Sequence, residues 1–165
     1  MQPSDALNVV AQVAVTLAGF AGIVVVFRPD SVHRWSALDK FRLRLLLANS
    51  ALPLGSSLFA ILLLTIHPPP MAIWRWCSGF VLAVDLVFQI TNRNPWRVIP
   101  AAEFQAVSKI MYYSTAALVF GALGLQVFNI VLWNQFWPFF AILFVHLLAA
   151  IVQFVRMVLL SPTRD

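Results

Sequence analysis

The chain has 165 residues, of which 61% are hydrophobic and only 10% are charged, and its formal net charge at pH 7 is +5. An ordinary soluble domain contains about 45–50% apolar and about 25% charged residues, so this composition argues against one and indicates an integral membrane protein. Nucleic acid is not an expected partner, because the basic residues cluster in polar links between apolar runs, where they meet anionic lipid head groups.

Five apolar runs are each long enough to cross a bilayer, which takes about 20 residues of helix. They predict an all-α fold: a polytopic helix bundle that forms one transmembrane domain over residues 1–165. The expected spans, in chain order, are residues 5–27, 43–66, 72–91, 111–133 and 138–160.

The links between the spans carry turn signals. Pro53 lies inside the second run and is expected to bend that helix. The segment His67-Pro68-Pro69-Pro70 ends it sharply, and the longest polar link is predicted to hold a short interfacial helix over residues 101–109. A short uncharged turn at residues 134–137 joins the last two spans, so these should be antiparallel neighbours.

Charge asymmetry predicts the orientation. Ten of the eleven Lys and Arg residues lie in or beside the links 28–42 and 92–110 and the end of the chain, which share one side of the membrane. The positive-inside rule places that side in the cytoplasm, so we expect the N-terminus outside and the C-terminus cytoplasmic. The run from Leu17 to Arg28 is typical of a bacterial inner (plasma) membrane protein.

Polar residues of different spans fall at two depths when each helix is given a rise of about 1.5 Å per residue. Such residues are expected to face the bundle interior, because unpaired polar groups are costly in hydrocarbon. The layer in the cytoplasmic third comprises Asp85, Asn49, Ser50, Gln89, Gln153, Arg44 and Arg156. The outer layer comprises His146, Gln126 and Gln12.

Asp85 and His146 are the two residues with the clearest alternatives. Asp85 is either a proton or cation site or one half of an ion pair with Arg44 or Arg156, and the ion pair is the favoured interpretation. His146 is interpreted as a packing histidine bonded to Gln126 or Gln12, in preference to a proton relay or a haem ligand.

The sequence contains no phosphate-binding loop, no zinc-protease motif and no nucleophile elbow, so we expect no enzymatic activity, no cofactor and no metal. The favoured hypothesis is an accessory or interaction subunit of a larger membrane complex. The alternative is a homo-oligomeric ion or proton channel with Asp85 and His146 on its pathway. Small residues at four-residue spacing, such as Ala51 and Gly55 or Ala117 and Gly121, are explained by packing within one subunit.

Overall fold

The computed structural model describes residues 2–27, 31–68, 70–92 and 109–159, and every long element in them is helical. Five helices are long and apolar enough to cross a membrane, which confirms the prediction of a multi-pass helical protein. They are α1 (Pro3–Phe27), α2 (Ala37–Leu64), α3 (Ile73–Asn92), α5 (Lys109–Phe128) and α6 (Phe136–Leu159). Two short elements accompany them, the 3-10 turn η1 (Val32–Arg34) and the π-helical turn η3 (Asn129–Trp133).

The largest difference from the predicted spans is at the start of α2, which begins at Ala37 rather than at residue 43. Ser36 caps this helix, because its side chain accepts a hydrogen bond from the Asp39 amide over 3.1 Å. Hydropathy detects only the apolar part of a helix and therefore misses this polar first turn. The helix continues through Pro53, while the predicted interfacial helix at 101–109 lies almost wholly outside the described residues.

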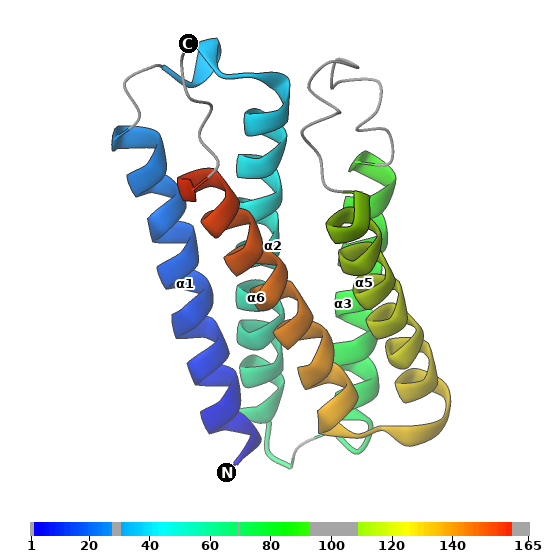
Figure 1. Cartoon of the computed structure of the whole chain (residues 1–165). Helices are drawn as coiled ribbons and strands as arrows, with labels where there is room; N and C mark the ends of the chain where they lie inside the picture. Colours follow the sequence, from blue (N-terminus) through cyan, green and yellow to red (C-terminus); the bar gives the residue numbers. More distant parts are fainter. Residues whose placement is uncertain (1, 28–30, 69, 93–108, 160–165) are drawn as a thin grey trace.

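The five helices alternate in direction along the chain (Figure 1). α1 packs mainly against α2 and α6, and α6 also contacts α5 and α3. In Figure 1, α6 runs obliquely, starting beside α3 and α5 at the lower end and finishing near α1 and α2 at the upper end. This oblique course lets one helix contact all four others, and α6 therefore supplies much of the interior.

The core follows helical spacing. On α1 the buried residues recur every three or four positions, at Leu7, Val10, Ala14, Leu17 and Ala21. The other faces of the five helices carry many exposed Val, Leu, Ile and Phe side chains. In a protein with five candidate spans, such faces are suited to contact with lipid.

A polar group, which we call the turn cluster, ties η3 and the turn after it to the start of α3. It consists of the buried side chains of Ser78 and Asn129, the half-buried side chain of Asn134 and the backbone of Gln135. Asn129 Nδ2 donates to Ser78 Oγ over 2.8 Å and to the Gln135 carbonyl over 3.0 Å, and Asn129 Oδ1 accepts from the Gln135 amide over 2.8 Å. Asn134 takes the left-handed conformation at φ 52°, which Asn tolerates better than most residues.

Asn134 also caps α3 from outside that helix. Its Oδ1 accepts a hydrogen bond from the Arg75 amide over 3.2 Å, and its Nδ2 donates to the Met71 carbonyl over 2.8 Å. The first amides of a helix have no partner within it, and the Arg75 amide is shared between Asn134 Oδ1 and the carbonyl of Ala72, just before α3, at 3.0 Å. The start of α3 is thereby fixed against the turn that precedes α6.

Candidate functional site: a buried histidine and aspartate

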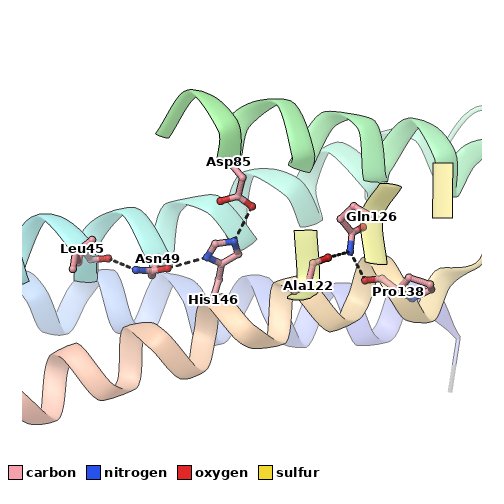
Figure 2. Close-up of polar contacts among 7 residues, drawn as sticks. All are labelled: Leu45, Asn49, Asp85, Ala122, Gln126, Pro138 and His146. Carbon is pink, nitrogen blue, oxygen red and sulfur yellow. Dashed lines mark hydrogen bonds and ion pairs between the residues drawn. The ribbon is translucent and has the colours of Figure 1, made fainter. Parts of the chain in front are cut away.

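Three polar side chains from three helices meet inside the bundle, and we call them the central polar cluster. They are Asn49 on α2, Asp85 on α3 and His146 on α6 (Figure 2). His146 Nδ1 lies 2.8 Å from Asn49 Oδ1, and His146 Nε2 lies 3.0 Å from Asp85 Oδ2. The exposed fractions are 8% for Asn49, 0% for Asp85 and 2% for His146, so the cluster is removed from the surface.

Asn49 determines the protonation of one ring nitrogen. Its Nδ2 donates to the Leu45 carbonyl over 2.8 Å, one turn earlier on α2, and this bond points Oδ1 at the imidazole (Figure 2). An amide oxygen can only accept a hydrogen bond, so His146 Nδ1 must carry a proton and donate it. The only proton of the ring that remains to be assigned is the one between Nε2 and Asp85.

Two arrangements satisfy that second contact. Either the imidazolium donates a hydrogen bond from Nε2 to an ionised Asp85, or the Nε2 of a neutral imidazole accepts a hydrogen bond from a neutral Asp85 carboxyl. Both contain the same number of protons and both carry no net charge. The pair can therefore be buried at a lower cost than an isolated ion in the membrane.

The second carboxylate oxygen of Asp85 is different, because Oδ1 is buried and has no hydrogen-bond partner in the described chain. A buried carboxylate oxygen without a partner is uncommon in proteins, and it is costly when the group is ionised. Oδ1 is therefore an atom of the cluster at which a further proton can bind without breaking an existing bond.

This geometry corrects the partners expected from the sequence. Within the described residues, Asp85 pairs with His146 and not with Arg44 or Arg156. His146 bonds to Asn49 and Asp85, and not to Gln126 or Gln12. The ion-pair interpretation of Asp85 was thus right about a partner but wrong about its identity.

The separation of Asp85 and His146 into two layers was also wrong. Counting residues along each axis assumes that all helices are parallel and ignores the reach of the side chains. α6 instead runs obliquely (Figure 1), and the imidazole and carboxyl groups extend toward each other (Figure 2). A histidine assigned to the outer layer therefore meets an aspartate assigned to the inner one.

The other residues of the expected inner layer are dispersed. Ser50 is fully buried and donates to the Leu46 carbonyl over 2.8 Å. Gln153 is 9% exposed and its Oε1 has no partner among the described residues, whereas Gln89 is half-buried. Arg156 is half-buried and Arg44 is exposed. None of these side chains is bonded to the central polar cluster within the described residues.

The three residues of the expected outer layer, His146, Gln126 and Gln12, are not bonded to one another within the described residues. Gln126 is fully buried, and its Nε2 donates to the Pro138 carbonyl over 2.7 Å and to the Ala122 carbonyl over 3.1 Å (Figure 2). It therefore ties α5 to the first turn of α6. Gln12 is exposed on α1 and lies apart from the interior.

Two buried polar residues, Asp39 and Asn129, were not predicted from the sequence to belong to the interior. Asp39 is 4% exposed and forms an ion pair of 3.4 Å with the buried Arg42, three residues later on α2. The pattern Ser36-x-x-Asp39, which resembles a capping box, was the available signal that α2 starts early. Asn129 gave no comparable signal, because its contacts depend on the π-helical turn.

The described residues include no group of three or more His, Cys, Asp or Glu side chains that could hold a metal ion. Comparison of the chain with protein-family models, with curated proteins and with solved structures finds no match. The central polar cluster is therefore interpreted from its own geometry.

Proposed function

We propose that the protein transfers protons within a membrane and that His146 and Asp85 are the exchanging groups. The observation that carries this proposal is a histidine and an aspartate joined over 3.0 Å inside the bundle, with Asp85 Oδ1 unpartnered. Ionisable residues inside membrane spans are costly, and they often belong to proton or ion pathways.

The chemistry at this site needs only the proton shared between Nε2 and Oδ2 and one further proton. A proton that binds at Asp85 Oδ1 converts the ion pair into an imidazolium beside a neutral carboxyl group, with a net charge of +1. The pair returns to neutrality when one proton leaves it for a water molecule that enters the bundle, so one proton is taken up and one is released. Asn49 keeps Nδ1 protonated throughout, which confines the exchange to the Asp85 side of the ring.

Polar side chains lie on the same helix faces on both sides of the cluster. Gln153 is seven residues from His146 on α6, and Ser78 is seven residues from Asp85 on α3, so each is about two turns away. Gln153 and Ser78 are both buried. Because the cluster is formed by one chain, the proposed pathway runs inside a single bundle and does not require the homo-oligomer expected from the sequence.

Proton flux into liposomes that contain the purified protein and a pH-sensitive dye tests the proposal. We expect flux with the unaltered protein, and Asp85→Asn should reduce it to the level of protein-free liposomes. Gln126→Leu is the matched control, because it alters a buried polar side chain outside the central polar cluster. Absence of flux from the folded, unaltered protein, or equal flux from Asp85→Asn, would overturn the proposal.

We propose that the protein lies in the inner membrane of a bacterium and that its N-terminus is outside the cytoplasm. Support comes from the basic residues at the start of α2 and the end of α6, which lie at the same end of the bundle (Figure 1).

Cysteine labelling tests this topology. Met71 (99% exposed) and the exposed His33 lie at opposite ends of the bundle and are suitable positions for new cysteines, while the native Cys77 is fully buried. An impermeant maleimide should label Met71→Cys in intact spheroplasts, and His33→Cys only after lysis. The reverse labelling pattern would invert the topology.

A second candidate function is that of an interaction subunit, favoured by small residues on the outer face of α5. Ala117 and Gly121 are exposed one turn apart, and a Cβ at Gly121 would meet nothing within 4 Å. Packing within this chain does not use this pair, contrary to the expectation from the sequence. Such pairs allow close approach of another membrane helix.

The interaction hypothesis requires one stoichiometric partner that co-purifies with the protein. We expect Gly121→Leu to abolish that association and Gly19→Leu to preserve it, since Gly19 is also exposed and unobstructed but lies on α1. Recovery of a monodisperse protein without a partner would contradict this hypothesis.

A further inference from the structure

An apolar groove lies between α2 and α3, with a volume of about 710 Å³. Its α3 wall is formed by side chains at helical spacing, including Phe80, Val84 and Val87, and its α2 wall includes Leu43 and Leu47. The volume falls within the range of about 300–1,000 Å³ that is typical of small-molecule sites. The groove is therefore large enough for a hydrocarbon chain.

Small residues of α2 create the space. Ala48, Ala51 and Gly55 recur along the groove, and a Cβ at Gly55 would meet nothing within 4 Å. Near the far end, Phe59 and Phe80 stack with ring centroids 4.3 Å apart and join the two helices. α2 and α3 thus contact each other there and leave a groove along the rest of their length.

Two cations line the opposite end. Lys40 and Arg44 are one turn apart on α2, both are exposed, and both line the groove. Lys40 Nζ donates one hydrogen bond to the His33 carbonyl over 2.9 Å and retains two further protons for other acceptors. Arg44 has no hydrogen-bond or ion-pair partner within the described ranges, and none of the lining residues is acidic.

We propose that this groove binds one anionic phospholipid, with an acyl chain between α2 and α3 and the phosphate at Lys40 and Arg44. From Lys40 to Gly55 the helix rises by roughly 22 Å, so the site extends from a cationic end into the apolar part of the bundle. A phospholipid has the same order of charge and hydrocarbon along its length. Arg44, which has no acidic partner among the described residues, is then paired with the lipid phosphate.

Native mass spectrometry of the detergent-solubilised full chain, titrated with phosphatidylglycerol or phosphatidylcholine, tests this proposal. We expect one phosphatidylglycerol to bind in preference to phosphatidylcholine. Arg44→Gln should weaken phosphatidylglycerol binding by about fivefold, as should Lys40→Gln, because each basic residue contributes comparably to the attraction of anionic lipid. Arg34→Gln is the matched control, since Arg34 is exposed near the same end but does not line the groove.

A second variant tests the hydrocarbon part of the site. Gly55→Leu should fill the groove and weaken binding of both lipids, whereas Gly121→Leu, on α5, should leave binding unchanged. Circular dichroism of each variant establishes that the helices are retained. Equal binding of the two lipids would overturn the proposal, as would an Arg34→Gln effect as large as that of Arg44→Gln. Occupation of the groove by a second copy would also overturn it, and would be seen as dimers without bound lipid that Gly55→Leu dissociates.

Discussion

The central polar cluster and the turn cluster both bury an asparagine, but they differ in how completely their polar atoms are paired. Asn129 is fully buried and uses both side-chain ends, donating twice and accepting once. Asn49 likewise donates and accepts, but the chain of bonds that it begins ends at Asp85 Oδ2, and the other carboxylate oxygen, Oδ1, has no partner in the described chain. A fully paired cluster holds a turn in place, whereas the unpaired carboxylate oxygen leaves room for exchange.

The two clusters also differ in their chemistry. The turn cluster contains amides and a hydroxyl, which do not change charge in the accessible pH range. The central polar cluster contains an imidazole and a carboxyl, which are acid–base groups. A substitution that leaves an unpaired charge in the central polar cluster should therefore lower the free energy of unfolding more than one that removes neutral hydrogen bonds from the turn cluster.

The largest expected effect is that of His146→Leu, which removes the one hydrogen-bond partner that the Asp85 side chain has among the described residues. The carboxyl is then buried without compensation, and we expect a loss of about 3 kcal/mol in the free energy of unfolding. SDS-induced unfolding in mixed micelles measures it. The double variant His146→Leu/Asp85→Leu should recover most of the loss, because it removes the orphaned carboxyl as well. A double variant no more stable than the single one would show that packing, and not charge, dominates at this site.

Asn129→Leu should have a smaller effect, because no charge is left behind. The substitution removes three hydrogen bonds and leaves the buried Ser78 hydroxyl and the Gln135 backbone groups without Asn129. We expect a loss of about 2 kcal/mol in the same unfolding assay. Proton flux per folded molecule should be unchanged, since the substitution leaves His146, Asp85 and the Ser78 hydroxyl in place. A loss of flux in folded Asn129→Leu would mean that the two clusters are coupled.

Much of the fold could be predicted from the sequence, because hydropathy and helical spacing are local properties. The five spans follow from apolar runs, and residues such as Asn49, Ser50 and Gln153 were expected to face the interior and do. Gln12, which was expected in the outer polar layer, is exposed on α1 instead.

The pairing within the interior could not be predicted, because it depends on how the helices cross. The contact between Asp85 and His146 arises from the oblique course of α6 (Figure 1), which no residue count along a helix reveals. The side of α2 on which Arg44 lies could not be predicted from the sequence either. Its neighbour Arg42 turns inward to Asp39, while Arg44 lines the groove beside α3.

The smallest expected effects come from two serines that are equally buried but differently bonded. Ser78 and Ser57 are both 0% exposed, yet Ser78 Oγ accepts from Asn129, while Ser57 Oγ has no partner in the described chain. Ser78→Ala should therefore cost about 1 kcal/mol in the unfolding assay, and Ser57→Ala should change stability by less than about 0.5 kcal/mol. The change in side-chain volume is the same in both variants, so their difference isolates the hydrogen bond. Equal losses would mean that the Ser57 hydroxyl is bonded in the membrane, and the contrast between paired and unpaired polar atoms would then be weaker than the two clusters suggest.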